Sequence, residues 1–219
     1  MTKSNNNSEE SPEEGAEDSS ESQQVLVFPD LGSDTSCLKS FAIYGEINEE
    51  QGRDATQALQ ILHDKVCAEL PKSKDDDEPC ERPNIELLIS TEGGHVQDMF
   101  SIYDCMRLVR RDCDIETFGV GRIMSAGILL LAGGTHGKRK VGKNCRLMMH
   151  SVQGGHFGSI KELETDIREV RWYQQQLTSA LLEETKLSLK ELKAIFRKKT
   201  DTYFNAEQAV KWGIADEVV

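Results

Sequence analysis

The sequence predicts an α/β domain built on parallel strands. Segments with strand character alternate with segments of helical periodicity through the middle of the chain, in the order strand, helix, strand, helix, strand, helix. Such alternation favours parallel pairing with right-handed crossovers. A length of 219 residues is enough for one well-buried core and short for two. One folded domain over residues 25–219 is therefore expected.

The first strand and helix follow from composition and spacing. Residues 40–47, SFAIYGEI, alternate and are rich in β-formers. The NEE that follows is an Asn before acidic residues, which suits the start of a helix. One face of that helix carries Ala55, Leu59, Leu62, Val66 and Leu70.

The middle of the chain repeats this pattern. IELLIS (85–90) is predicted to be a strand, TEGG a turn, and the segment from His95 a helix with Met99, Ile102, Met106 and Val109 on one face. DIETFGV is a further strand and SAGILLLAGG a short buried helix. KRKVGKNCRLMMH is interpreted as a strand pair that ends in His150.

A long amphipathic helix is predicted over residues 159–185. Apolar residues recur there every three or four positions, and so long an arm should pack against another surface, for which a second subunit is a plausible partner. Two short helices should follow, the first beginning at Ser188 with Glu191 completing a capping box and the second at Asn205, before a terminal strand.

Two segments have the composition of solvated chain. Residues 1–24 hold seven acidic residues and one Lys, which supply −6 of the formal net charge of −12, and almost nothing apolar. Such a tail cannot bury enough surface to offset its conformational entropy and is predicted to be disordered. The charged insert 71–83, PKSKDDDEPCERP, is predicted to be a loop.

Composition also argues against several classes of function. The chain lacks a basic stripe with interleaved aromatic residues, so nucleic acid is not expected as a partner. An acidic surface repels anionic lipid, the longest apolar run is about half of what a membrane span needs, and the N-terminus has no signal or transit pattern. A cytoplasmic protein without membrane contact is expected. The six cysteines form no CxxC pair, which favours reduced thiols over disulfides or zinc; no metal and no cofactor are expected.

Ser125, at the head of the short buried helix, has two interpretations. Serine is a preferred helix N-cap, and on that fact alone capping is the simpler explanation. A nucleophilic serine needs a base, a group to orient the base, and two N–H donors for the oxyanion. The GxSxG elbow is absent, because position 123 is Ile. However, His150 ends a strand, STEGG joins a strand to a helix, and the Ala126 N–H begins a helix.

Four blocks of sequence resemble the proteolytic subunit of the Clp protease (ClpP), a serine peptidase family. They are STEGGHVQDMFSIYDCMRLVR, GVGRIMSAGILLLAGGTHGKR, CRLMMHSVQGGHFGSIKELE and TDTYFNAEQAVKWGIADEVV, in the family's order and with the family's spacing of 25 residues between Ser125 and His150. The resemblance covers about residues 38–219.

The resemblance implies a fold, a site and an assembly. The fold is a ClpP/crotonase-like spiral of β-β-α units with a protruding handle helix, here 159–185. Ser125 would be the nucleophile, His150 the general base and Asp201 the group that orients the imidazole, with the backbone N–H groups of Gly94 and Ala126 as oxyanion donors. Two stacked seven-membered rings would degrade unfolded polypeptides. The chain has no GxxxxGK[ST] loop, so ATP hydrolysis would come from a separate AAA+ unfoldase of the Clp type.

Some positions depart from the family pattern. Glu92 replaces a Pro before the double glycine, Ala126 replaces a Met after the nucleophile, and Ser151-Val152 replaces Gln-Pro after the histidine. The GGHFG segment is either a simple hairpin or, as in the family, a strand that pairs with extended substrate. His95, His136 and His156 show no partner pattern and are interpreted as solvated or loop residues.

Two other functions remain as alternatives. One is a catalytically inactive structural or regulatory ring subunit, although such family members lack triad residues that are all present here. The other is a crotonase-type coenzyme-A enzyme, which uses paired N–H donors on a thioester oxyanion. That alternative would leave Ser125 and His150 at their spacing unexplained.

Overall fold

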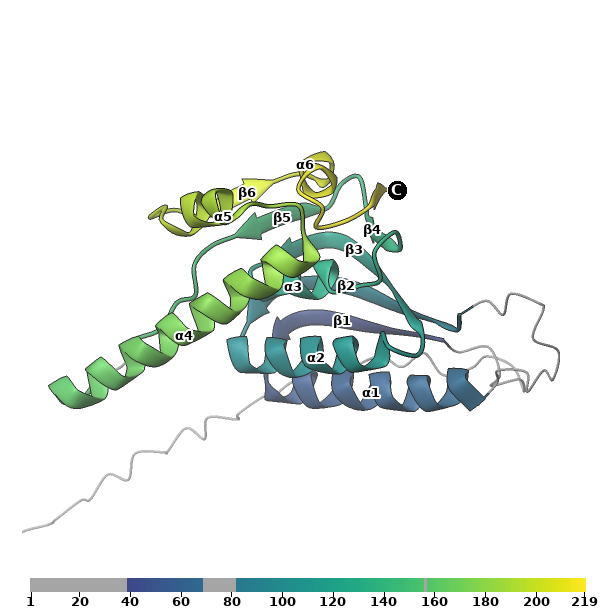
Figure 1. Ribbon diagram of the computed structural model, residues 1–219, viewed down its shortest axis with the longest axis horizontal. Coiled ribbons are helices and arrows are strands. Elements are labelled where there is room, and N and C mark those ends of the chain that lie inside the picture. Colours follow the sequence, from purple (N-terminus) through teal and green to yellow (C-terminus); the bar gives the residue numbers. More distant parts are fainter. Residues whose placement is uncertain (1–38, 69–81, 156) are drawn as a thin grey trace, which may run out of the picture.

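The structure, a computed structural model, describes residues 39–68, 82–155 and 157–219 (Figure 1). The predicted tail at 1–24, most of the predicted insert at 71–83, and Leu70 lie outside the described residues.

The described chain folds around one seven-stranded, mostly parallel sheet. Five strands follow one another in the order β1-β2-β3-β4-β7, and every pairing along this path is parallel. The strand β5 pairs in parallel with β3 and antiparallel with β6. The predicted parallel α/β architecture is confirmed. The strands are β1 Ser40–Ile47, β2 Asn84–Gly94, β3 Asp114–Met124, β4 Arg139–Val141, β5 Arg146–Met149, β6 Thr202–Phe204 and β7 Glu217–Val218.

The strand β3 changes partner along its length. Its residues 117–119 pair with β4, whereas residues 122–124 pair with β5. The two strands predicted in KRKVGKNCRLMMH are present, but the interpretation as a pair was wrong, because each pairs with β3 and not with the other. The same strand therefore joins the main sheet to the small β5-β6 unit, and this second half of β3 leads directly into Ser125.

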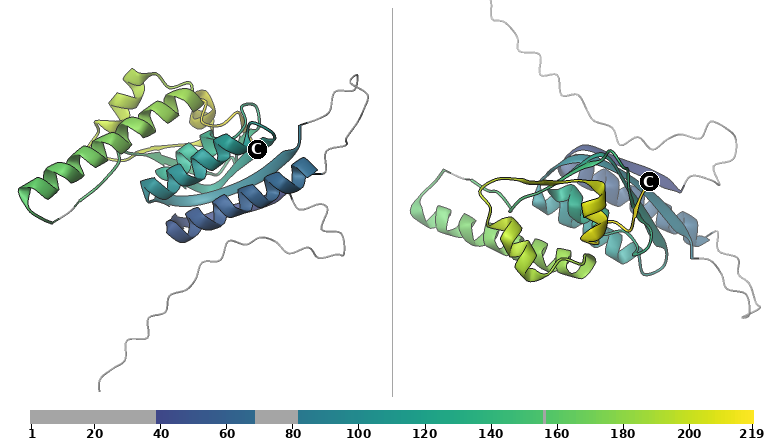
Figure 2. Two further views of the ribbon diagram at one scale, coloured as in Figure 1. Left: turned by 60° about the horizontal axis from the view of Figure 1, so that its bottom comes forward. Right: turned by 90° about the horizontal axis from the view of Figure 1, so that it is seen from above.

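Two helices lie side by side against the sheet, α1 Glu49–Ala68 and α2 Val96–Val109 (Figures 1 and 2). Asn48 begins α1 as predicted, since its Oδ1 accepts a hydrogen bond from the Gln51 N–H. The described residues of both predicted apolar faces are buried. A third helix, α3 Ala126–Ala132, is short, and all seven of its residues are buried, because the sheet, α2 and α4 surround it. It therefore has a rigid environment.

The C-terminal third contains three helices, α4 Ile160–Glu184, α5 Leu189–Phe196 and α6 Ala206–Lys211. The predicted starts at Ser188 and Asn205 are confirmed by side-chain caps. Ser159 adds a capping box at the start of α4. Only the last turns of α4 hold buried residues, and the rest of the helix projects away from the body in every view (Figures 1 and 2).

The base of α4 is anchored by Glu184, a buried carboxylate. It accepts hydrogen bonds from Arg110, at 2.5 and 3.0 Å, and from the Tyr103 hydroxyl at 2.8 Å. His136 is an exposed loop residue, as interpreted from the sequence, and its Nε2 also lies 3.1 Å from the Glu184 Oε2. Burial raises the pKa of Glu184, but hydrogen bonds and charge from Arg110, with Tyr103 and His136, outweigh it and hold the pKa below its ordinary value.

The described cysteines, Cys67, Cys105, Cys113 and Cys145, are free thiols. Burial raises the pKa of Cys113 and Cys145 to about 11, so both are protonated at neutral pH. Within the residues that the structure describes, no group of three His, Cys, Asp or Glu side chains could hold a metal ion. None of the described helices is both long and apolar enough to span a membrane.

Candidate active site

Ser125 has an unusual backbone conformation. It joins β3 to α3 with φ 53° and ψ −114°, and it is the one non-glycine residue with positive φ among the described residues. Its side chain makes no capping hydrogen bond, so the structure does not support the capping interpretation. Such a conformation costs about 1–3 kcal/mol and persists only where the surroundings fix it. Here the Ser125 N–H donates to the Met148 carbonyl on β5 at 2.9 Å.

Close backbone packing explains the glycines around Ser125. A Cβ at Gly93, where φ is +97°, would lie 2.6 Å from the Ser125 Cβ. A Cβ at Gly127 would lie 2.5 Å from the Thr91 Cγ2. Any larger residue at either position would push the end of β2 away from the start of α3. The sharp turn at Ser125 is therefore built without the glycine that the elbow pattern has at position 123.

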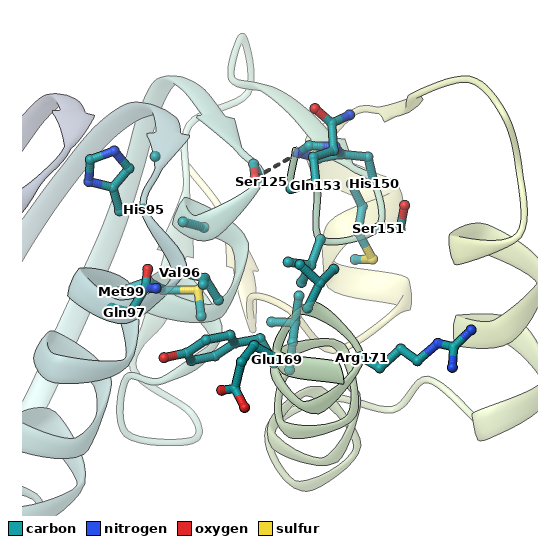
Figure 3. A pocket seen from close by; sticks show the side chains of 18 of the residues that line it. His95, Val96, Gln97, Met99, Ser125, His150, Ser151, Gln153, Glu169 and Arg171 are labelled. Carbon is teal, nitrogen blue, oxygen red and sulfur yellow. Dashed lines mark hydrogen bonds between the residues drawn. The ribbon is translucent and has the colours of Figure 1, made fainter. Parts of the chain in front are cut away.

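His150 contacts Ser125 directly. Its Nε2 lies 2.8 Å from the Ser125 Oγ, a hydrogen-bond distance. His150 follows the last residue of β5, and the two side chains point toward each other from neighbouring strand ends (Figure 3). The other ring nitrogen, Nδ1, is buried and has no hydrogen-bond partner in the described chain. Nδ1 can therefore form one further hydrogen bond.

Asp201 lies next to His150 but does not bond to it in this structure. β5 and β6 pair antiparallel with Met149 opposite Thr202, and continuing this register by one residue brings His150 opposite Asp201. Opposed residues of an antiparallel pair have Cβ atoms about 4.5–5.5 Å apart on the same face. Asp201 is exposed and His150 is half-buried. A side-chain rotation of Asp201 is therefore the movement that would join the two.

All five residues predicted for the site line one cavity of about 1070 Å³. They are Gly94, Ser125, Ala126, His150 and Asp201. The walls carry both apolar and polar side chains, and α4 runs along one side of the cavity (Figure 3). The lining includes Val96 and Met99 from α2, Met148 and Met149 from β5, and Val170 and Leu177 from α4.

Gly94, the last residue of β2, lines this cavity. The N–H groups on either side are engaged, since Gly93 donates to the Thr91 Oγ1 at 2.9 Å and His95 donates to the Ile47 carbonyl at 2.7 Å. The segment TEGG was predicted to be a turn, but it continues β2, because Gly93 and Gly94 pair with β1 beyond an irregularity in the register. The pairing with β1 therefore fixes the position of Gly94 at the end of the sheet.

The segment after His150 rests on α4. The Val152 N–H donates to the Gln174 Oε1 at 2.7 Å, a bond that proline at position 152 could not make. A Cβ at Gly154 would lie 2.6 Å from the Val170 Cγ2, so the segment passes close to the helix. The described residues of GGHFG and those before it, 151–155 and 157–158, form no strand or hairpin in this structure.

Sequence reasoning missed several polar residues around the site. Glu92, one of the departures from the family pattern, lines the cavity, but its pairing with Arg122 at 2.7 Å was not foreseen; both side chains are about half exposed. Thr91 and Gln174 were not singled out; a hydroxyl two residues before a double glycine was the available signal for Thr91. His95 lies across the cavity from His150 and contacts Asp98 at 3.3 Å (Figure 3). His156 lies outside the described residues.

Comparison with known proteins identifies the family. Residues 41–219 match the sequence profile of the family described as Clp protease. The chain belongs to the Clp protease family. This Clp-family chain is 32% identical over 136 residues to the ATP-dependent Clp protease proteolytic subunit 2 of Chlamydia trachomatis serovar D. It is 31% identical over 138 residues to the protein of the same name from Chlamydia pneumoniae.

These alignments are partial. The match to the Chlamydia trachomatis protein covers 62% of this chain and 65% of the relative, and the match to the Chlamydia pneumoniae protein covers 63% and 66%. The Clp-family chain thus matches slightly less than two thirds of the length of these relatives. The α/β architecture with a mostly parallel sheet agrees with membership of the family.

Proposed function

We propose that this chain is a serine endopeptidase that hydrolyses peptide bonds of unfolded proteins. The observation that carries the proposal is the 2.8 Å contact between Ser125 Oγ and His150 Nε2, at a backbone turn held in a strained conformation inside a large cavity. Neither the inactive-subunit nor the coenzyme-A alternative requires this pair, and family membership favours peptide hydrolysis.

The first half of the reaction forms an acyl-enzyme. His150 Nε2 accepts the hydroxyl proton as Ser125 Oγ forms a bond to the substrate carbonyl carbon. The carbonyl oxygen becomes an oxyanion, and the N–H groups of Gly94 and Ala126 are the donors aimed at it. The imidazolium of His150 then gives its proton to the leaving amine as the C–N bond breaks.

The second half restores the enzyme. Water enters, His150 accepts one of its protons, and the hydroxide oxygen attacks the ester carbonyl through a second oxyanion in the same hole. Collapse returns the proton to Ser125 Oγ and releases the carboxylate product. Asp201, opposite His150, would accept the Nδ1–H, fix the tautomer and stabilise the imidazolium. The buried Nδ1 without a partner supports this role.

The proposed assembly and partners follow from family membership. Two stacked seven-membered rings would meet through the projecting α4, and a separate AAA+ unfoldase of the Clp type would deliver substrates. Exposed apolar side chains on α4, such as Ile160 and Ile167, support a partner surface there. The chain itself is proposed to use no cofactor and to act in the cytoplasm.

A fluorophosphonate reagent tests the nucleophile. It should label Ser125 of the assembled protein, as located by mass spectrometry of the digest, and a fluorogenic peptide should be cleaved. Ser125→Ala should abolish both signals, since no other group supplies the attacking oxygen. Ser151→Ala is the matched control, because Ser151 lines the same cavity without contacting His150 through an observed hydrogen bond. A correctly assembled wild type that neither reacts nor cleaves would support the inactive-subunit alternative instead.

A further inference from the structure

Thr91 connects three parts of the site. It is fully buried on β2, two residues before Gly93. Its Oγ1 donates to the Gly45 carbonyl on β1 at 2.5 Å and accepts the Gly93 N–H at 2.9 Å. A Cβ at Gly127, in the first turn of α3, would lie 2.5 Å from the Thr91 Cγ2. One side chain therefore contacts the first strand, the glycine turn and the helix that follows Ser125.

The hydroxyl determines which glycine amide faces the cavity. A serine or threonine hydroxyl that accepts the N–H two residues later closes a small turn of the main chain. The Gly93 N–H is directed at Thr91 and so is not available to a substrate, and Gly94 is the glycine of this pair that lines the cavity. The bond to Gly45 holds the hydroxyl itself in place from the neighbouring strand.

We propose that Thr91 is a positioning residue for the oxyanion hole, in which its hydroxyl fixes the Gly93-Gly94 turn and its methyl group sets the distance from that turn to the Ser125–Ala126 helix start. This inference rests on the proposed peptidase function. Thr91 acts through Gly94 and Ala126 and does not itself touch the substrate. Its two functions are separable, because the hydroxyl and the methyl group make different contacts.

Two substitutions separate the hydroxyl from the methyl group. Thr91→Val keeps the shape and removes the hydroxyl, so the Gly93 N–H loses its acceptor and the turn can rotate. Loss of one oxyanion donor lowers kcat by about 100- to 1,000-fold, and displacement of a donor should cost less, roughly 10- to 100-fold. KM should change by no more than about threefold, because the oxyanion forms only after binding. Thr91→Ser keeps the hydroxyl and removes the methyl group, so kcat should fall, but by less than in Thr91→Val.

A tetrahedral inhibitor reports on the hole directly. A peptide boronate forms an adduct with the serine oxygen that places a boronate oxygen in the oxyanion hole. Transition-state analogues depend on interactions made late in the reaction, so the inhibition constant of the boronate should weaken in Thr91→Val by about the same factor as kcat falls. If Thr91 had only a structural role, kcat and the inhibition constant of the boronate would not change by the same factor with KM unchanged.

Thr117→Val is the matched stability control. Thr117 is equally buried, and its hydroxyl donates to the Leu131 carbonyl at 2.8 Å, at the opposite end of α3 from Ser125. It should lower the melting temperature by an amount comparable to Thr91→Val while kcat stays within about twofold of wild type. If Thr91→Val does not assemble, Thr91→Cys replaces it, since a thiol of similar size is a weak donor and acceptor and should give an intermediate loss of kcat.

The outcomes distinguish this inference from the proposed function. Equal effects of Thr91→Val and Thr117→Val on kcat and on boronate inhibition would overturn the role of Thr91. So would a Thr91→Ser variant as slow as Thr91→Val. A wild-type protein that neither cleaves the peptide nor binds the boronate would instead contradict the peptidase function.

Discussion

At the scale of single residues, the site depends on backbone geometry as much as on side chains. Ser125 is held at φ 53° by a hydrogen bond to β5 and by the buried α3 that follows it. Gly93 is the residue that lets β2 approach it, because any Cβ there would collide with the Ser125 Cβ. The proposed nucleophile and the proposed oxyanion donors therefore depend on the same close packing of β2 against the start of α3.

The strain at Ser125 predicts an unusual order of stability. Ser125→Gly and Ser125→Ala both lack the hydrogen bond to His150, so a comparison between them isolates the backbone. Relief of strain, about 1–3 kcal/mol, exceeds the extra unfolded-state entropy of glycine, about 0.4–1 kcal/mol. Ser125→Gly should therefore melt a few degrees above Ser125→Ala by calorimetry. A lower melting temperature for the glycine variant would show that the turn is not strained.

Sequence reasoning selected Ser125 and His150 as candidates but did not predict their local geometry. The positions of Ser125 and His150 follow from the family resemblance, and their contact agrees with it. The conformation of Ser125 could not be predicted, because it results from long-range packing of β2 and β5 and the local elbow pattern is absent. The bond from Thr91 to Gly45 joins residues 46 positions apart, which no local pattern reveals.

At the scale of elements, local signals predicted most helix boundaries well. Ser188 and Asn205 carry their own capping chemistry, so their helices could be located from a few neighbouring residues. The three-residue β6 was missed because so short a segment has no measurable periodicity, and its place is fixed by pairing with β5. The end of β2 was predicted as a turn because glycines usually break strands, whereas here they allow close packing.

The anchor of α4 predicts a dependence of stability on pH. The pKa of Glu184 is lowered in the folded chain, so its stabilising contribution is complete above about pH 5, the region of the unfolded pKa, and disappears as pH falls through the lower folded value. Glu184→Gln should cost about 2–3 kcal/mol at pH 7, less than the 3–5 kcal/mol of a fully buried pair, because Arg110 is partly exposed. The difference from wild type should shrink as pH falls below the ordinary pKa of a glutamate, about 4.3.

Thermal unfolding at pH 7, 5, 4 and 3 measures this effect. Glu183→Gln is the matched control, because Glu183 pairs with Arg107 on the surface and should contribute little at any of these pH values. A difference between wild type and Glu184→Gln that does not change with pH would contradict the ionised anchor.

At the scale of the whole molecule, α4 is the helix whose apolar side chains are not all covered within a single chain. Its N-terminal end extends beyond the body, and Ile160 and Ile167, seven residues apart on one face, are exposed by 77% and 51% (Figure 1). A solvated helix does not need such a row of apolar side chains. The proposed ring-to-ring contact would bury it.

Substitution on that row tests the assembly. Wild type should sediment as a fourteen-subunit particle, and the double variant Ile160→Glu, Ile167→Glu should shift to seven subunits, because each glutamate would be buried without a partner. Lys161→Glu, a charge change on an exposed side chain of the same helix, should leave the particle unchanged. A monomeric wild type over a wide concentration range, or a double variant that keeps the wild-type sedimentation coefficient, would contradict the proposed contact.

The backbone at Ser125 also bears on how such genes evolve. A gene copy released from selection for catalysis would gain stability by replacing the serine with glycine, whereas a copy under selection must keep a side chain at positive φ. Retention of serine at this strained position is then a mark of selection for catalysis, independent of the histidine and the aspartate. Among paralogues within one genome, this position would separate active subunits from decayed ones before any protein is purified.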